Sequence, residues 1–260
     1  MRRLGWAMCG ALAAVSVLAG CSGGPTEADP SASHRATAAP SPNASSPSPS
    51  PSPTPVTYPL RGSGTYSVAA GDSAVLGRSG SLLRFRVAVE HGIDNLPAAT
   101  FADDVVTILG DRRGWTAGGD VRLQRVGPGR PYDFTVYLVT PATRDVLCGT
   151  VFDRYTSCQN GNSVVVNVSR WVHAVPYYAG DLTGYREYAI SHEVGHRLGH
   201  GHELCPGKGR PAPTMEQQTL GLHGCTAQPW PYPDGKRYAG PSGEYPLVVP
   251  TDPKSYYRTD

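Results

Sequence analysis

Three histidines and one glycine between residues 192 and 202 constrain the fold of this chain more than any other feature. His192 and His196 are four residues apart, so on an α-helix their side chains lie on one face, one turn apart. Gly199 follows them and can adopt the positive φ angle that ends a helix and turns the chain back. Without that turn, His202 would point away from the other two histidines. The spacing therefore predicts a helix that ends at Gly199 and a turn that returns His202 to the same face.

The same residues form the pattern H-E-x-x-H-x-x-G-x-x-H, which can bind a metal ion. Three imidazoles suit Zn²⁺ and leave one position open for water. Glu193 follows the first histidine, and its carboxylate can act as a general base on that water without binding the metal. We therefore predict one catalytic zinc ion, bound by His192, His196 and His202. His200 is the alternative third ligand if the helix continues past Gly199.

The residues around this motif predict a helix over residues 182–198, with Thr183 as its N-cap. Ile190, Val194 and Leu198 are spaced four residues apart and form an apolar stripe that can pack on a sheet. The histidines then face away from this stripe, toward a cleft.

The first 21 residues predict export and lipid attachment. Arg2 and Arg3 precede an apolar stretch that is short for a membrane span and ends in Leu-Ala-Gly-Cys at residues 18–21. This ending resembles a bacterial lipobox, which implies that residues 1–20 are a signal peptide and that Cys21 carries diacylglycerol. The predicted location is the outer face of the bacterial cytoplasmic membrane. An ordinary secretory signal and a transmembrane anchor are the alternatives.

Glycine and proline are abundant in this chain. With 31 glycines and 25 prolines among 260 residues, the chain is not one uniform globular domain. Residues 21–58 begin with the lipidated Cys21 and continue with Ser, Pro, Thr, Ala and Gly, which contain too little apolar surface to form a core. We predict a semi-rigid, disordered tether there. Residues 59–260 then form one domain, with a loop-rich part after Gly199.

The charge of the chain limits its partners. The formal net charge is +2, and removal of the signal peptide with Arg2 and Arg3 leaves a formally neutral protein. This balance argues against a nucleic-acid partner. The predicted partners are a protein or peptide substrate, including cell-wall peptide, and the membrane through the lipid, with the protein as a monomer.

Apolar and alternating segments predict strands that are interleaved with two long helices. This arrangement predicts an α/β (α+β) fold with a mixed, twisted sheet. The strands are expected at 65–69, 82–90, 121–126, 134–140 and 163–168, and the helices at 101–109 and 182–198.

The cysteines predict two disulfides. Cys9 leaves with the signal peptide and Cys21 carries lipid, so four cysteines remain in an exported protein. Four cysteines allow three pairings, of which we favour the two local bonds, Cys148–Cys158 and Cys205–Cys225.

The histidine motif, together with a methionine downstream, resembles the metzincin clan of zinc metalloproteases. Met215, in the segment PAPTME (211–216), matches the Met-turn that lies beneath the zinc ligands in that clan. The resemblance implies a metzincin-like zincin domain and an extracytoplasmic zinc-dependent endopeptidase. It assigns Glu193 as the general base, as the motif itself does.

More closely, residues 191–204, followed by CPGKGRPAPTM, QQT (217–219) and GLHGC, resemble a family of actinobacterial exported proteins. That family has a domain of unknown function with a zincin core. Some metzincins carry a tyrosine two residues after the methionine, where this chain has Gln217. Stabilisation of the oxyanion is then expected from zinc, backbone amides or another side chain, with Tyr177 and Tyr178 as candidates.

Two other functions use the same residues. The first is hydrolysis of cell-wall peptide cross-links by the same zinc chemistry. The second is a non-catalytic, zinc-stabilised binding lipoprotein, in which Cys205 or His223 would be a fourth ligand.

Overall fold

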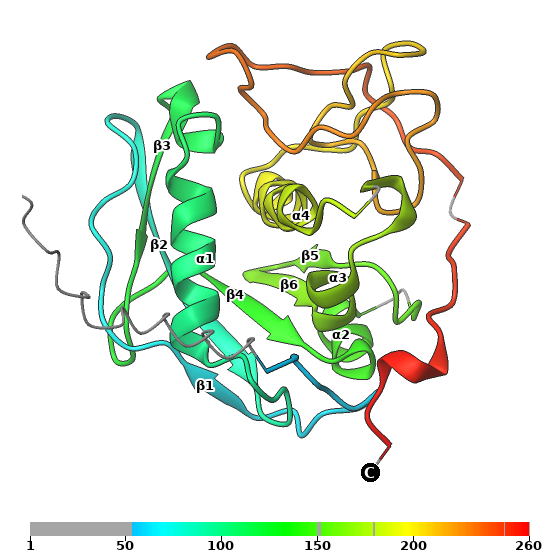
Figure 1. The fold of residues 1–260 in the computed structure, drawn as a ribbon. Coiled ribbons are helices and arrows are strands. Elements are labelled where there is room, and N and C mark those ends of the chain that lie inside the picture. Colours follow the sequence, from blue (N-terminus) through cyan, green and yellow to red (C-terminus); the bar gives the residue numbers. More distant parts are fainter. Residues whose placement is uncertain (1–53, 150–151, 179, 247, 260) are drawn as a thin grey trace, which may run out of the picture. The chain divides into compact units, whose positions relative to one another are not determined.

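The computed structural model describes residues 54–149, 152–178, 180–246 and 248–259 (Figure 1). The predicted signal peptide, Cys21 and nearly all of the predicted tether lie outside these residues. The folded part begins before residue 59, because Thr57 pairs with Asp94 in an isolated bridge and Tyr58 is only 1% exposed. The tether therefore ends a few residues earlier than its composition suggests.

A mixed sheet forms the centre of the fold. In the described residues its strands are β1 (Tyr66–Val68), β2 (Ser81–Glu90), β3 (Val121–Arg125), β4 (Phe134–Val139), β5 (Cys158–Asn160) and β6 (Ser163–Asn167). Their order is β1-β2-β4-β6-β5, and β3 also pairs with β2. The β2 strand is parallel to β3 and β4, and β4 is parallel to β6, whereas β1 and β5 are antiparallel to their neighbours. The predicted mixed sheet and α+β class are confirmed.

Every second side chain along β2 and β4 lies on the face of the sheet that packs in the core. Phe85 and Val87 of β2 are buried and pair in register with Phe134 and Val136 of β4. The two phenylalanine rings stack with their centroids 5.5 Å apart. Because side chains of a strand alternate between faces, these residues share the face that the long helices cover.

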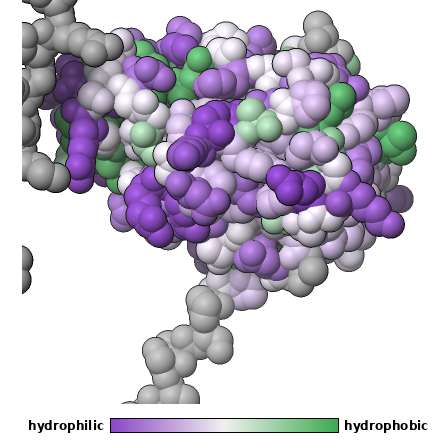
Figure 2. All heavy atoms as spheres, turned by 90° about the horizontal axis from the view of Figure 1, so that it is seen from above, coloured by the Kyte–Doolittle hydropathy of each residue, from purple (hydrophilic) through white to green (hydrophobic). Residues whose placement is uncertain are grey.

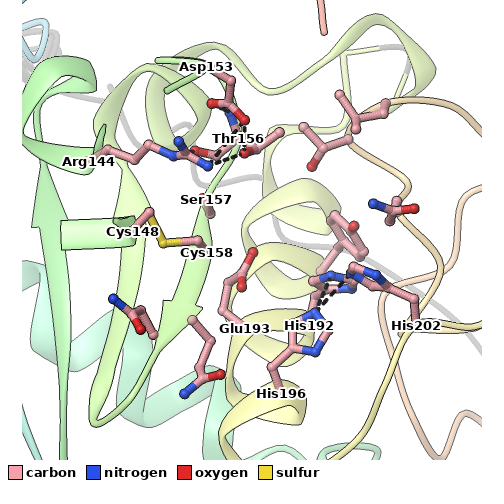
Figure 3. Close-up of a pocket in the computed structure, with 16 residues that line it drawn as sticks. Arg144, Cys148, Asp153, Thr156, Ser157, Cys158, His192, Glu193, His196 and His202 are labelled. Atoms are coloured by element: carbon pink, nitrogen blue, oxygen red, sulfur yellow. Dashed lines mark hydrogen bonds and ion pairs between the residues drawn. A yellow bond between two sulfur atoms is a disulfide. The ribbon is translucent and has the colours of Figure 1, made fainter. Parts of the chain in front are cut away.

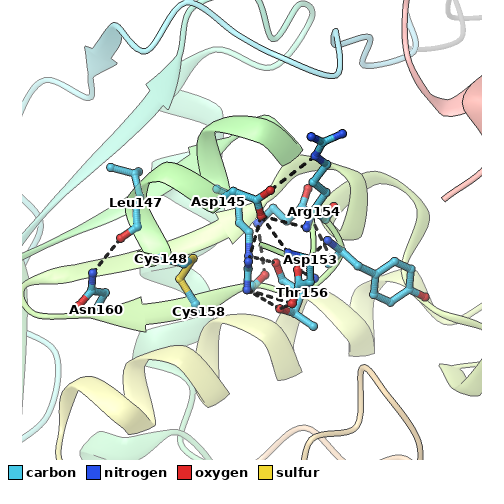
Figure 4. Close-up of a disulfide and its surroundings, with 12 residues drawn as sticks. Asp145, Leu147, Cys148, Asp153, Arg154, Thr156, Cys158 and Asn160 are labelled. Carbon is cyan, nitrogen blue, oxygen red and sulfur yellow. Dashed lines mark hydrogen bonds and ion pairs between the residues drawn. A yellow bond between two sulfur atoms is a disulfide. The ribbon is translucent and has the colours of Figure 1, made fainter. Parts of the chain in front are cut away.

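In the part of the chain that the structure describes, four α-helices accompany the sheet. They are α1 (Ala98–Gly110), α2 (Pro141–Cys148), α3 (Val168–His173) and α4 (Leu182–Arg197), with single 3₁₀ turns at Trp115–Gly118, Pro176–Tyr178 and Lys254–Tyr256. The predicted helices correspond to α1 and α4. Strands β5 and β6 lie between α4 on one side and α2 on the other (Figure 4).

The predicted strand at 163–168 is confirmed with an earlier end, whereas the predicted N-cap of α4 was wrong. The strand predicted at 163–168 ends one residue earlier, because the Asn167 side chain accepts a hydrogen bond from the Ser169 backbone N–H and begins α3 at Val168. Helix α4 is capped by Asp181 and not by Thr183. The Asp181 carboxylate accepts a hydrogen bond of 2.8 Å from the Gly184 N–H, so Thr183 lies inside the first turn.

The apolar stripe of α4 packs as expected. Ile190 and Val194 are fully buried in the main core, and Leu198 packs against it. A second core cluster on α4 includes the tyrosines Tyr185 and Tyr188. Helix α4 therefore packs in two core clusters, and this packing fixes the direction in which its remaining face, with His192 and His196, points.

The chain after α4 forms loops around the end of that helix (Figure 1). The structure pairs Cys205 with Cys225 in this part, and Cys148 with Cys158 beside β5, which are the two local pairings. The last residues return to the domain, where Asp252 forms a buried ion pair with Arg170 and the Arg258 N–H donates to the Tyr58 carbonyl.

The surface seen in Figure 2 is mostly polar, with small and separate apolar patches. Among the described residues, no helix has the length and apolar character needed to cross a membrane.

Candidate metal centre

Helix α4 and the turn after it carry the three histidines. His192 and His196 lie one turn apart on α4. The helix then ends, with hydrogen bonds from the Gly199 N–H to the His196 carbonyl and from the His200 N–H to the Gly195 carbonyl. Gly199 has a φ of +95°, which glycine adopts without strain and which redirects the chain. The turn places His202 beside the helix.

The three imidazole rings converge on one point (Figure 3). The Nε2 atom of His196 lies 3.1 Å from the Nε2 atoms of both His192 and His202. One ring nitrogen from each histidine lies within 4.8 Å of the others. The structure thus brings together the three residues that the motif predicts as ligands.

The other nitrogen of each ring has a hydrogen-bond partner. The Nδ1 atom of His192 lies 2.8 Å from the Thr214 carbonyl oxygen, and that of His196 lies 2.8 Å from the His200 carbonyl oxygen. The Nδ1 atom of His202 lies 3.0 Å from Oε1 of Glu244. Each partner is an acceptor, so each Nδ1 carries the proton. Three Nε2 lone pairs are therefore directed at one another.

This donor set fits a zinc ion. Three adjacent lone pairs repel one another unless a cation lies between them. In a tetrahedral site with zinc–nitrogen bonds of about 2.0–2.1 Å, two ligand nitrogens are about 3.3 Å apart, close to the separation seen here. Hydrogen bonds from the second nitrogen to carbonyl or carboxylate oxygens are also typical of zinc-binding histidines.

Burial affects the protonation of this centre. It lowers the pKa of His192 well below its ordinary value, and the neighbouring His196 and His202 lower it further. The pKa of His196 is lowered for the same reasons, burial first and His202 second. Both rings are therefore neutral at pH 7, the form that binds a metal ion.

Glu193 lies beside the histidines and is nearly buried, with 6% of its surface exposed. Burial raises the pKa of its carboxyl to about 8, while the Arg144 guanidinium acts in the opposite direction. A divalent cation at the histidines would favour the ionised form. No hydrogen bond from the described residues engages this carboxylate, so it is available for proton transfer.

A pocket of about 460 Å³ opens over the histidines and Glu193. One wall is formed by β5 and the loop before it. This wall carries the polar side chains Ser157, Gln159 and Asn160, and Gln217 and Thr219 add polar groups elsewhere in the lining.

Arg144 also lines this pocket and lies beside Asp153 and Thr156 (Figure 3). Its guanidinium forms ion pairs of 3.1 Å with both Asp145 and Asp153, and donates a hydrogen bond of 2.7 Å to the Thr156 hydroxyl. This network shapes the loop that leads to β5, and the Cys148–Cys158 disulfide joins α2 to the same strand. The pocket wall is therefore firmly attached to the sheet.

Met215 lies against the underside of α4. It is fully buried in a turn closed by a hydrogen bond from the Glu216 N–H to the Pro213 carbonyl. A Cβ atom at Gly195 would collide with the Met215 sulfur and with the Trp115 ring. Only glycine at position 195 allows the methionine to approach the helix between the two zinc-ligand candidates.

The alternative ligands lie elsewhere. His200 stacks on Trp115, with ring centroids 4.2 Å apart, and His223 stacks on Tyr245 at 3.4 Å. Cys205 is bonded to Cys225. None of these side chains joins the three histidines, so the described residues supply three ligands and no fourth.

The two tyrosines considered for stabilising the oxyanion, Tyr177 and Tyr178, lie outside the pocket. Tyr177 is exposed, and the buried Tyr178 donates its hydroxyl hydrogen bond to Gln218, so neither lines the pocket. Gln217 does line the pocket, and its Oε1 accepts a hydrogen bond from the Tyr245 N–H. Gln217, two residues after Met215, therefore has its side-chain amide at the pocket.

Sequence reasoning missed two residues of the site, Arg144 and Glu244. Pro141 after Thr140 is a helix-start signal that would have indicated α2, and with it the position of Arg144. Glu244 has no local signal, because its partner His202 is 42 residues away in the sequence.

Fold and site together define an α+β protein with a three-histidine centre in an open pocket. A family model described as "Protein of unknown function (DUF3152)" matches residues 52–233. The chain belongs to this family. No curated protein and no solved structure matched the chain.

Proposed function

We propose that this protein is a zinc-dependent endopeptidase of the metzincin type. The observation that carries the proposal is the convergence of three Nε2 atoms, each on a ring whose Nδ1 is held by an acceptor. His192, His196 and His202 would hold the ion. The position of Met215 beneath the helix supports the resemblance to metzincins.

When bound, Zn²⁺ supplies a Lewis acid that polarises a peptide carbonyl and makes water a stronger nucleophile at neutral pH. Glu193 accepts the proton of the attacking water and passes it to the leaving amine. Its burial and its lack of hydrogen bonds from the described residues suit a group that must exchange a proton during each cycle.

A peptide is the substrate that best suits the pocket. Strand β5 pairs only with β6 among the described strands, so its other edge offers backbone groups to a ligand. An extended peptide can pair with such an edge, and all three residues of β5 line the pocket. The polar side chains Gln159, Asn160 and Gln217 can contact further backbone or polar groups of the peptide.

The polar lining also favours a second candidate, hydrolysis of peptide cross-links in the cell wall. Stem peptides of the wall are short and polar, and the same residues would act on them. A non-catalytic binding role is less well supported, because Cys205 and His223, which could have closed the metal site, have other partners.

The test compares Glu193→Gln with Glu187→Gln, a change of the same kind on the same helix but outside the pocket. We expect Glu193→Gln to bind zinc as the parent does and to cleave peptides at least about 10²-fold more slowly. Glu187→Gln should cleave at the parental rate. A zinc-loaded Glu193→Gln variant with parental activity would show that the assignment is wrong.

Two parallel digestions by the full-length protein distinguish the two candidate substrates. One uses a proteome-derived peptide library, and the other uses purified peptidoglycan. Cleavage of the library with a defined site preference supports the endopeptidase, and release of cross-linked stem peptides alone supports the wall hydrolase. If zinc-loaded protein released neither product, the non-catalytic binding role would be the better proposal.

We also propose that the protein is an exported lipoprotein. The two disulfides of the described residues fit an oxidising compartment outside the cytoplasm. Incorporation of a labelled fatty acid that is lost in Cys21→Ser tests the lipid attachment, and unchanged labelling of that variant would contradict it.

A further inference from the structure

Residues 240–245, here called the C-terminal segment, run beside the chain around the third histidine. The Gly243 N–H donates a hydrogen bond of 3.2 Å to the His202 carbonyl, and the Leu204 N–H donates one of 2.7 Å to the Pro241 carbonyl. Glu203 and Ser242 form an isolated bridge between these hydrogen bonds. The C-terminal segment is thus paired with the stretch that delivers His202.

Within this segment, the Glu244 carboxylate contacts one of the three proposed ligands, His202. Its Oε1 atom lies 3.0 Å from the Nδ1 atom of His202. The next residue, Tyr245, fixes the backbone at this point. Its N–H donates to Gln217, its hydroxyl accepts from the Cys205 N–H, and its ring stacks on His223. Glu244 is therefore directed at His202 although its side chain is 71% exposed.

The three imidazoles differ in what orients them. The acceptors for His192 and His196 are backbone carbonyls of Thr214 and His200, which no substitution removes. Only His202 depends on a side chain. That side chain also lies outside residues 52–233, the stretch that the family model matches.

A carboxylate acceptor has two effects on a histidine ligand. It keeps the proton on Nδ1, which leaves the Nε2 lone pair free for the metal, and it fixes the rotation of the ring. It also strengthens the histidine as a ligand. Loss of such a partner typically weakens metal binding about 10- to 100-fold.

We propose that Glu244 is a positioning residue of the metal centre, and that the C-terminal segment is a part of this centre. This inference rests on the proposed zinc-binding function. Glu244 acts through His202 and does not contact the metal itself.

The experiment measures zinc affinity of the full mature chain by competition with a chelator of known affinity. The variants are Glu244→Gln and Glu244→Ala. The matched control is Asp234→Asn, which removes one negative charge from an exposed residue of the same C-terminal region. We expect about 10-fold weaker binding in Glu244→Gln, a loss approaching 100-fold in Glu244→Ala, and parental affinity in Asp234→Asn.

Each result has a separate meaning. Parental affinity in both Glu244 variants would overturn the positioning role while the zinc-binding proposal stands. An equal loss in Asp234→Asn would also overturn it, because general electrostatics would then explain the effect. A parent protein that binds no zinc would refute the proposed function itself, and this inference with it.

A second measurement needs no variant. Imidazole ¹⁵N chemical shifts of the zinc-loaded parent report which nitrogen of His202 binds the metal and which carries the proton. We expect the proton on Nδ1. A proton on Nε2 of His202 in the parent would overturn the inference, whatever the stability of the variants.

Discussion

Replacing Glu216 with glutamine should remove a large part of the pH dependence of this protein's stability. Glu216 follows Met215, is fully buried, and has no hydrogen-bond partner for either carboxylate oxygen. Its carboxylate lies within 4.8 Å of the sulfur atoms of Cys205 and Cys225. Burial without a partner raises the pKa of this carboxyl from its ordinary value of 4.5 to about 7.

The sign follows from the direction of this shift. The folded protein favours the protonated carboxyl, whereas the unfolded chain ionises freely above pH 4.5. The stability contribution of Glu216 is therefore complete below pH 4.5 and is lost as the pH rises to about 7. A shift of this size corresponds to about 3 kcal/mol of unfolding free energy, of which about 2.5 kcal/mol falls between pH 5 and pH 9.

The assay is chemical unfolding of the parent and of Glu216→Gln at pH values from 5 to 9, with the disulfides intact and with a chelator present. The chelator keeps the histidines metal-free in both proteins, so their titration cancels in the comparison. We expect the stability of Glu216→Gln relative to the parent to rise by about 2.5 kcal/mol across this range. Asp103→Asn, at an exposed position of α1, is the control and should show no such rise.

The absolute stability of Glu216→Gln is not the test, because a buried amide also lacks partners. The test is the change with pH. A difference between Glu216→Gln and the parent that stays constant within about 0.5 kcal/mol from pH 5 to pH 9 would refute the reasoning, because Glu216 would then ionise equally in the folded and unfolded states.

Two further perturbations probe the scaffold of the centre. Gly195→Ala should lower the unfolding free energy by about 1–3 kcal/mol through its collision with Met215, although alanine is the better helix former. Gly201→Ala, where nothing lies within 4 Å of a new Cβ, should stay within about 0.5 kcal/mol of the parent; a Gly195→Ala variant as stable as Gly201→Ala would contradict the contact. Replacing Cys205 and Cys225 together by alanine should cost about 3 kcal/mol in the same unfolding assay, because the bond closes a loop of 20 residues. Unchanged stability on non-reducing samples would show that the bond does not constrain the chain.

The central elements of this fold could be predicted from local patterns. Helix α4, strands β2 and β4 and both disulfides follow from apolar spacing and from cysteine separation. Apart from Pro141 at its start, helix α2 has no such local signal, because Thr143, Arg144 and Asp145 are buried by a hydrogen-bonded network rather than by an apolar stripe. Without apolar periodicity, its sequence resembles a polar loop.

The site was predictable to a similar degree. The convergence of His192, His196 and His202 follows from spacing and from the glycine between them. Gly199 also favoured His202 over His200 as the third ligand, but the stacking of His200 on Trp115, which holds His200 away from the centre, could not be predicted. That contact, like the one between Glu244 and His202, joins distant parts of the chain, and no local pattern encodes it.

The pairing of His202 with the C-terminal segment has a consequence for the order in which the centre is completed. Synthesis delivers a chain from its N-terminus, so the histidines emerge before Glu244, which follows His202 by 42 residues. Until the final residues arrive, the third imidazole can rotate and exchange its proton with solvent. The proposed metal centre would therefore be complete only after residue 244 has joined the fold, and a chain truncated before that residue would carry all three histidines without the acceptor that orients His202.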